Sequence, residues 1–474
     1  MVTRSTWRRR LAASRRLRVS PLSVLADAMR YMLRALLTLW LILAGATLAR
    51  AETVVFTDVN VVPMDTERVI PRTTVIVRDG VIASVGSKAK LPAGTKVIDG
   101  EGAWLVPGLA DMHNHVTTRD DLTLLLANGV TTMLNMGEAA NAFAGRTRIA
   151  VNKGDVPGPY IFTAFVVDSD PQYGHFVVRT ADEGRAIVRL AKANGYSFMK
   201  VYTNLSADAF AGIADEAQRQ GIGVVGHNVK AVGLAKQLAA GQAMVAHVEE
   251  FFYGFFPEPP ADDQNAPPPD AGIADAIALV KAYGAFVTSD LFNYRTIAAQ
   301  FGKPEVVRAY LAAPEARYLS PADRIGWAQS GYQKKAVDLS RRVAFEARFV
   351  KAMADAGVPL ITGGDAPTIP GQVPGFALHE EIDAMLAAGL TPWQALSAAT
   401  RAPGEFIAKT VPGAAKFGVV APGYRADLLL VAENPLERPA TLRSPLGVMA
   451  DGRWHDAAAL KAMLADVAAK RIVP

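Results

Sequence analysis

The fold is decided by an apolar strand that ends in two histidines, Trp104-Leu105-Val106-Pro107-Gly108-Leu109-Ala110-Asp111-Met112-His113-Asn114-His115. Side chains alternate along a strand, so His113 and His115 project to the same side of the chain and Asn114 points elsewhere. A single histidine is most often a hydrogen-bonded core or loop residue. Two at this spacing, directly after a strand, predict ligands that hold one metal ion.

Four further polar residues each close a short apolar segment downstream, namely Lys200, His227, His247 and Asp365. A (β/α)8 barrel presents its catalytic side chains at the carboxyl ends of its strands. His227 and His247 are twenty residues apart, about one βα unit, which places them on neighbouring strands. We therefore expect six donors to meet at one end of a barrel. Asp365 at the last strand could also accept a proton from an attacking water, as a general base does.

Lys200 admits two interpretations, because it lies inside the apolar segment 197–202. It could extend along the strand and place its ammonium in solvent. A buried ammonium is costly unless it is paired or altered, and a protonated lysine cannot bind a cation. Carboxylation of its amine by carbon dioxide would give a carbamate able to bridge two divalent ions.

Strand-like runs alternate with alanine-rich helical stretches from about residue 107 to 412, which is typical of a parallel sheet and here of a closed barrel. Short β-rich runs with turns occupy 52–106, including the hairpin turn Asp79-Gly80, and recur in 413–474. We expect them to form a small antiparallel sheet, as one β-sandwich built from both termini. Two inserts, 251–271 and 290–357, are long enough to be functional lids or disordered inserts, and helical patterns in the second, such as 335–356, predict that it packs as extra helices. The eight barrel strands are expected at 104–111, 129–134, 160–164, 197–201, 222–226, 243–246, 284–288 and 358–363.

Charge is unevenly distributed along the 474 residues, although the net charge is +5. Residues 1–51 hold ten arginines and one acid, Asp27, so this leader carries +9 and the remainder 5 − 9 = −4. We therefore expect no nucleic-acid partner. Cysteine is absent, so any metal must be held by nitrogen and oxygen ligands.

The leader has the layout of a secretory signal peptide, in which Arg30 and Arg34 precede an apolar run that ends before Ala51. The run is shorter than the roughly 20 apolar residues of a membrane-spanning helix, which favours cleavage near Ala51 over retention as an anchor. The sequence therefore predicts an exported protein, periplasmic or secreted, without stable membrane contact after cleavage.

These motifs together resemble the amidohydrolase superfamily, and within it the binuclear branch with a carboxylated bridging lysine. The resemblance covers the chain after the leader and includes the closing motif Gly423 to Leu428. It implies that His113, His115 and Asp365 bind one metal, that His227 and His247 bind the other, and that Lys200 bridges both. The ions are expected to be Zn²⁺ and to hold a bridging hydroxide, with Asp365 as general base and acid.

The setting of Lys200 is most similar to exported amidohydrolases of the imidazolonepropionase-like and Xaa-Pro dipeptidase-like kinds. Imidazolonepropionases use a single metal, so Lys200 argues against that activity. We expect hydrolysis of an amide, of a dipeptide or an N-acyl amino acid. An esterase or lactonase of the same fold is the alternative, and a non-catalytic metal-binding relic is disfavoured by Asp365. The oligomeric state is open, and a homo-oligomer is compatible with the sequence.

Three residues are candidates for binding the substrate: His175, Tyr202 and Tyr253. His175 follows the third barrel strand and could bind a carboxylate or carbonyl, although a solvated loop histidine is an equal alternative. Tyr202 could instead be a packing residue, and Tyr253 part of an aromatic cluster, 251–256, that covers the site. His379, on the helix expected after the last strand, is interpreted as structural.

Overall fold

The computed structural model describes residues 53–86, 94–137 and 139–471, and these described residues form one compact unit. The predicted leader, 1–51, lies outside the described residues. Within the part of the chain that is described, no helix is long and apolar enough to cross a membrane.

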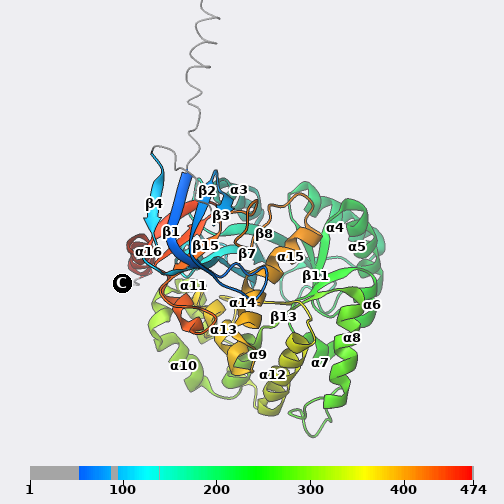
Figure 1. The fold of residues 1–474 in the computed structure, drawn as a ribbon. Helices are drawn as coiled ribbons and strands as arrows, with labels where there is room; N and C mark the ends of the chain where they lie inside the picture. Colours follow the sequence, from blue (N-terminus) through cyan, green and yellow to red (C-terminus); the bar gives the residue numbers. More distant parts are fainter. Residues whose placement is uncertain (1–52, 87–93, 138, 472–474) are drawn as a thin grey trace, which may run out of the picture. The chain divides into compact units, whose positions relative to one another are not determined.

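Eight parallel strands form the centre of the molecule (Figure 1). They follow one another around the sheet in chain order, except that the short strand β9 (Phe176–Val177) pairs off this path with β8. The Met112 N–H donates a hydrogen bond of 3.0 Å to the Thr362 carbonyl oxygen, which brings the last strand back to the first and nearly closes the barrel. The predicted (β/α)8 barrel is confirmed. Its strands are β6 (Leu109–Asn114), β7 (Val130–Asn135), β8 (Tyr160–Asp168), β10 (Phe198–Val201), β11 (Gly223–Gly226), β12 (Gln242–Val245), β13 (Phe286–Thr288) and β14 (Leu360–Ile361).

The barrel strands are apolar runs because both of their faces are covered. Every residue of β7 is buried, and so is every residue of β6. Some of the helices begin at a side-chain cap, as in α4, where Thr180 accepts a hydrogen bond from the Glu183 N–H in a complete capping box. The helices are α2 (Arg119–Ala127), α3 (Arg148–Lys153), α4 (Ala181–Ala193), α5 (Ala207–Gln220), α6 (Leu234–Ala239), α7 (Glu250–Gly254), α8 (Ile273–Tyr283), α9 (Leu291–Gln300), α10 (Pro304–Ala312), α11 (Pro321–Ala328), α12 (Ser340–Asp355), α13 (Phe376–Ala387), α14 (Pro392–Ala399), α15 (Arg401–Thr410) and α16 (Ala457–Lys470).

Both long inserts are folded parts of the unit. The insert between β13 and β14 forms the four helices α9 to α12, which confirms the expectation of extra helices. The insert after β12 begins with α7, and its aromatic cluster does not cover the site as suggested for 251–256. The Phe256 ring lies 5.3 Å from that of Phe345 and 5.2 Å from that of Phe349, centroid to centroid, so the cluster packs against α12. This anchoring leaves Tyr253 as the aromatic residue of 251–256 that lines the cavity described below.

A second sheet combines strands from both ends of the described chain, as predicted. β15 pairs antiparallel with β5 and so connects the two terminal segments. The expectation of a purely antiparallel sheet is wrong, because β1 pairs in parallel with both β4 and β5. β5 must run directly into β6 at Gly108, and this fixes its direction. The strands are β1 (Thr53–Val61), β2 (Ile70–Arg78), β3 (Val81–Val85), β4 (Lys96–Asp99), β5 (Trp104–Pro107), β15 (Leu428–Val431), β16 (Gly447–Ala450) and β17 (Arg453–Asp456).

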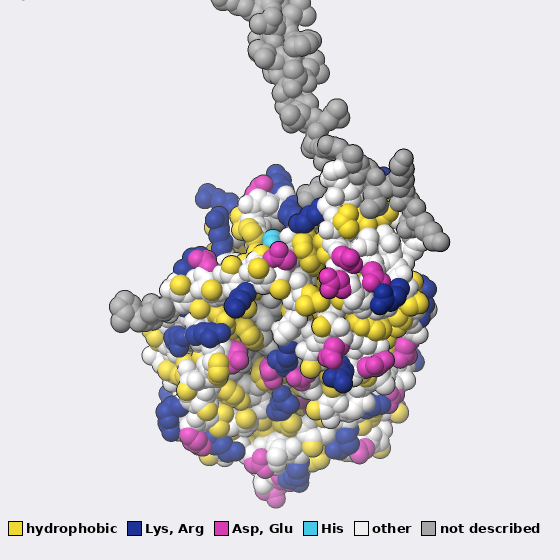
Figure 2. All heavy atoms as spheres, turned by 60° about the vertical axis from the view of Figure 1, so that its left-hand side comes forward, with side chains coloured by type: hydrophobic (Ala, Val, Ile, Leu, Met, Phe, Trp, Pro, Cys, Tyr) yellow, Lys and Arg dark blue, Asp and Glu magenta, His cyan; other side chains and the backbone are white. Residues whose placement is uncertain are grey.

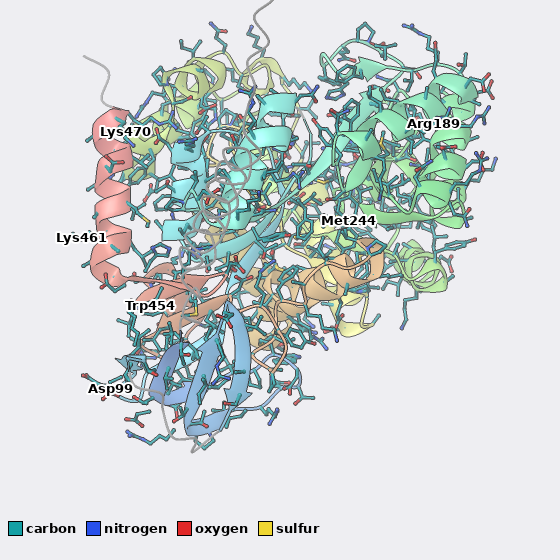
Figure 3. The ribbon with its side chains drawn as sticks, turned by 90° about the horizontal axis from the view of Figure 1, so that it is seen from above. Asp99, Arg189, Met244, Trp454, Lys461 and Lys470 are labelled. Atoms are coloured by element: carbon teal, nitrogen blue, oxygen red, sulfur yellow. The ribbon has the colours of Figure 1, made fainter. Side chains whose placement is uncertain are left out.

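The hairpin turn of this sheet has the backbone that its sequence predicts. Asp79 and Gly80 have φ angles of 52° and 76°, the left-handed values that a two-residue hairpin turn requires. Viewed from above, Asp99 and Trp454 lie in the terminal sheet, whereas Met244 lies in the barrel (Figure 3). The helix α16, which carries Lys461 and Lys470, contacts α2.

The closing motif 423–428 joins the terminal sheet to the barrel. Arg425 and Asp427 are both buried, and the Arg425 Nε donates a hydrogen bond of 2.6 Å to Asp427 Oδ2. The guanidinium also lies 4.3 Å from the ring centroid of Tyr160 and bonds the hydroxyl of Thr132, at the start of two barrel strands. The Gly108 N–H donates to the Asp427 carbonyl oxygen at 2.9 Å. The motif therefore has a structural role.

Charges of both signs are spread over the face shown in Figure 2, where lysine and arginine side chains are interspersed with aspartate and glutamate side chains. This distribution agrees with the small net charge calculated for residues 52–474.

Candidate metal centre

His113, His115 and Asp365 come together where β6 ends beside the end of β14. Asp365 Oδ1 lies 3.5 Å from His113 Nε2 and 3.3 Å from His115 Nε2. The backbone holds this geometry, because the Asp365 N–H donates to the His113 carbonyl oxygen at 2.7 Å. Asp365 has a φ of 46°, an uncommon value outside glycine that recurs at functional sites. These three residues could hold one metal ion.

Lys200, His227 and His247 lie beside this group. Lys200 Nζ is 3.3 Å from His113 Nε2, and the lysine is only 2% exposed. The His247 ring lies 4.3 Å from the His113 ring and 5.0 Å from the His227 ring, centroid to centroid. The structure therefore brings all six predicted donors together at the carboxyl ends of the strands, and Lys200 does not extend into solvent.

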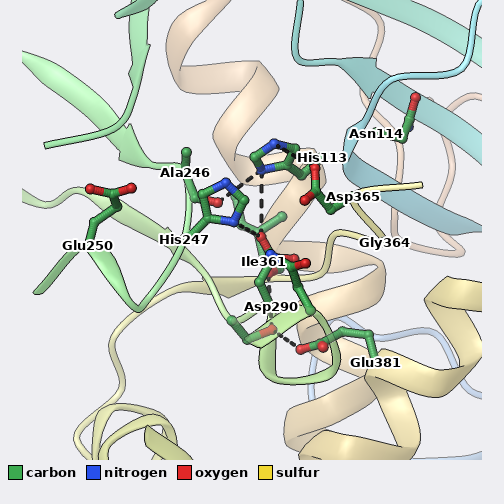
Figure 4. A network of polar contacts seen from close by, with 12 residues as sticks. His113, Asn114, Ala246, His247, Glu250, Asp290, Ile361, Gly364, Asp365 and Glu381 are labelled. Carbon is green, nitrogen blue, oxygen red and sulfur yellow. Dashed lines mark hydrogen bonds and ion pairs between the residues drawn. The ribbon is translucent and has the colours of Figure 1, made fainter. Parts of the chain in front are cut away.

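An oxygen atom faces one ring nitrogen of each of three histidines. His113 Nδ1 lies 3.0 Å from the Ala246 carbonyl oxygen, and His247 Nδ1 lies 2.7 Å from Asp290 Oδ2 (Figure 4). His227 Nδ1 lies 2.6 Å from Glu250 Oε1. Metal-binding histidines commonly have such a partner, which orients the ring and leaves the other nitrogen for the ion. The donor set therefore fits a divalent metal.

His113 and His227 are held in the neutral form that a metal requires. Burial lowers the pKa of His113 well below its ordinary value, and the charge of Lys200 lowers it further. Burial also lowers the pKa of His227 to about 4, against the opposing effect of the Glu250 carboxylate. Protons therefore do not compete for these nitrogens near neutral pH.

Sequence reasoning missed Asp290, Glu250 and the role of Asp111. Asp290 lies 3.6 Å from His113 Nδ1 as well as beside His247, and these three residues form a second group that could hold a cation. Burial raises the pKa of Asp290 well above its usual range, and the charges of Glu381 and Asp365 raise it further. Asp111 accepts hydrogen bonds of 3.2 Å from the N–H groups of His113 and Gly364, and so connects β6 to the end of β14. Asp290 follows an apolar strand as the other ligands do, and this signal could have identified it.

A cavity of about 650 Å³ opens onto these donors. The three predicted substrate residues all line it. The Tyr202 ring lies 4.1 Å from that of His227 and 4.5 Å from that of His175, while Tyr253 is about half exposed on α7. His175 is buried, so it is not a solvated loop residue. Sequence reasoning missed further lining residues, among them Lys230, Glu249, Tyr332 and Lys335. His379 lies elsewhere, buried on α13 with its Nε2 2.9 Å from the Asn128 carbonyl oxygen.

The model of the amidohydrolase family matches residues 104–455, well over half of the chain and all six donors. The chain belongs to the amidohydrolase family. Its similarity to the imidazolonepropionase of Ralstonia nicotianae is 29% identity over 401 residues, which covers 79% of this chain and 89% of that protein. The match to the imidazolonepropionase of Shewanella frigidimarina is local, with 44% identity over 71 residues, which cover 17% of that protein.

Two solved structures are also similar to this amidohydrolase. The bottromycin amidohydrolase has 25% identity and a TM-score of 0.70, and the superposition covers 89% of this chain and 91% of that one. A Xaa-Pro dipeptidase with methionine in its active site has 19% identity and a TM-score of 0.63, with 85% and 100% coverage, and it shows the shared fold. Members of the family are metal-dependent, in agreement with the donors assembled here. The protein is thus a hydrolase that acts on carbon–nitrogen bonds.

Proposed function

We propose that this amidohydrolase is a two-metal enzyme that cleaves the amide bond of a dipeptide or an N-acyl amino acid. The observation that carries the proposal is the burial of Lys200 among the histidines, with its Nζ 3.3 Å from His113 Nε2. A buried ammonium beside imidazoles would be unfavourable, whereas a carbamate would bind cations there. Five nitrogen or carboxylate donors surround it.

In this proposal His113, His115 and Asp365 would hold one Zn²⁺ ion, His227 and His247 would hold the other, and the carboxylated Lys200 would serve as a further ligand. Lys200 becomes a ligand when its neutral amine forms a carbon–nitrogen bond with CO2 and releases a proton, which leaves a carbamate with one negative charge. When bound, the ions supply a Lewis acid and an activated water at neutral pH.

Asp365 would move the proton during hydrolysis. Asp365 lies beside His113 in β6 and His115 just after it, and it lines the cavity, so its carboxylate reaches the same space as a bound substrate. It would accept the proton of the attacking water and return it to the departing amine, which could not leave as an anion. His175 and Tyr202, which also line the cavity, would position the substrate carbonyl or carboxylate.

The activity of the imidazolonepropionase relatives is disfavoured by Lys200, which a one-metal site does not need. The cavity holds the charged side chains Lys230, Glu249 and Lys335, so a small charged substrate suits it better than an apolar ester.

Metal analysis and a substrate panel test the proposal together. We expect about two equivalents of zinc per chain after purification with zinc and bicarbonate, and turnover of dipeptides or N-acyl amino acids that a chelator abolishes. Asp365→Asn should lower kcat by about 10²- to 10⁴-fold, the usual contribution of a general acid–base. Asp208→Asn, an exposed residue of α5, is the matched control. Less than one equivalent of metal, or cleavage of esters and lactones alone, would reject the proposal.

Export is also part of the proposal, and it is supported by the arginine-rich leader and the apolar run before Ala51. Amino-terminal sequencing of protein recovered from an expressing bacterium, fractionated into cytoplasm and periplasm, tests it. A mature chain that begins near Glu52 in the periplasmic fraction is expected, and an intact leader in the cytoplasm would reject export.

A further inference from the structure

Two adjacent glutamates beside the metal centre, Glu249 and Glu250, differ in whether their carboxylate oxygens have polar partners. Glu250 uses both: Oε1 lies 2.6 Å from His227 Nδ1, and Oε2 accepts a hydrogen bond of 3.0 Å from the Asn228 N–H. Glu249 Oε2 is buried and has no hydrogen-bond partner among the described residues. Glu249 precedes α7, yet its side chain does not cap that helix. A buried carboxylate oxygen without a donor is unfavourable unless a ligand supplies one.

Glu249 lines the cavity together with Tyr253 and Tyr332. Glu249 directly precedes α7, and Tyr253 lies four residues further on, one helical turn away, so both residues lie on the same side of this helix. Carboxylates and aromatic ring faces both attract cations. Glu249 and Tyr253 therefore give this wall of the cavity the chemistry that recognises an ammonium group, whereas the Tyr332 ring already faces the Lys335 ammonium.

The other charged residues that line the cavity have different roles. Lys200 and Asp365 belong to the metal centre, and Glu250 is paired with His227. Lys230 and Lys335 are exposed at the cavity, and Lys335 Nζ lies 5.2 Å from the Tyr332 ring centroid. These lysines suit a carboxylate, which dipeptides and N-acyl amino acids both carry. An ammonium group distinguishes the two classes, because acylation removes it.

We propose that Glu249 binds the free ammonium group of the substrate, so that the enzyme hydrolyses dipeptides with an unblocked amino terminus in preference to N-acyl amino acids. This inference rests on the proposed amide hydrolysis and selects one of its two substrate classes. Glu249 is thus a specificity-determining residue for the reaction.

The test compares substrates that differ only in the ammonium group. A dipeptide and its N-acetyl derivative are assayed with the zinc-loaded wild type and with Glu249→Gln, which keeps the size of the side chain and removes its charge. The wild type should prefer the free dipeptide by about 10- to 100-fold in kcat/KM, the range of a charge-assisted hydrogen bond. Glu249→Gln should lose this preference while it retains its zinc and its rate on the N-acetyl derivative. Glu258→Gln, an exposed residue of the same insert, is the matched control.

Calorimetric binding adds a readout that needs no turnover. The probes are two phosphinic dipeptide mimics, one with its terminal amine and one without, in which a phosphinate replaces the scissile amide. The wild type should bind the mimic with the amine more tightly than the mimic without it, whereas Glu249→Gln should bind the two mimics equally. Equal binding of both mimics by the wild type would overturn the inference. The inference would also be overturned if Glu249→Gln lost bound zinc and lost kcat/KM equally on both substrates, because Glu249 would then act by supporting His247. If the wild type neither binds a mimic nor cleaves either substrate, the proposed function itself fails, and this inference fails with it.

Discussion

His379 allows a quantitative prediction about how stability depends on pH. Its side chain is only 3% exposed, and its Nε2 lies 2.9 Å from the Asn128 carbonyl oxygen. Burial lowers the pKa of His379 to about 4, and the charge of Arg443 adds to this effect, against the opposing hydrogen bond to Asn128. The unfolded chain should have the ordinary value of about 6.5.

The sign follows from which state binds the proton more readily. Because the folded pKa is depressed, the unfolded state takes up the proton first as the pH falls below 6.5. The stability from neutral His379 is therefore full above about pH 7 and is lost progressively down to about pH 4. Between pH 7 and pH 5 the two pKa values give a loss of about 2 kcal/mol from this residue.

Chemical denaturation of the wild type and of His379→Gln at several pH values measures this loss. Glutamine can keep the hydrogen bond to Asn128 but does not titrate, and the difference between the two proteins removes the contributions of other groups and of the metal. The wild type should lose about 2 kcal/mol relative to the variant between pH 7 and pH 5. Activity at pH 7 should be equal in both. A difference in stability that stays constant with pH would refute the reasoning, because His379 would then titrate alike in both states.

Three further predictions concern the site and the closing motif. Lys200→Ala should reduce bound zinc from about two equivalents to one or fewer and abolish turnover, measured by elemental analysis and assay; full zinc binding would contradict the bridging role. Asp290→Asn should weaken zinc binding by about 10- to 100-fold, as loss of a partner that orients a histidine does, and competition with a chelator measures it; unchanged affinity would show that Asp290 does not orient His247. Arg425→Ala should destabilise the protein by about 3–5 kcal/mol, because it leaves Asp427 buried without its partner, with kcat unchanged in the remaining folded protein. Exposed Arg438→Ala, the control, should change the free energy of unfolding by less than about 1 kcal/mol, and equal effects would contradict the structural role of the motif.

Asp290 follows an apolar strand, which marks it as a candidate site residue, but local sequence could not predict its partner. It directly precedes α9, where an aspartate is typical of a helix cap. In the structure its side chain makes no cap hydrogen bond and lies instead 2.7 Å from His247 Nδ1. The position of the Asp290 side chain therefore depends on His247, which is more than forty positions away in the sequence. The pairing of Glu250 with His227 could not be predicted for the same reason, because neither residue indicates the other in the sequence.

The sequence by itself determined the barrel and its six donors. Apolar runs that each end in a histidine, lysine or aspartate must form strands, and parallel strands present their carboxyl ends at one edge, so His113 and Asp365 meet although 252 positions separate them. Only the tertiary structure decided which side chains support those donors and which face the substrate. Periodicity places a residue on a strand or helix, but the partner of a buried oxygen is set by packing between distant elements. Glu249 and Glu250 are adjacent in the sequence, and the fold pairs Glu250 with a histidine but leaves a buried oxygen of Glu249 without a hydrogen-bond partner among the described residues.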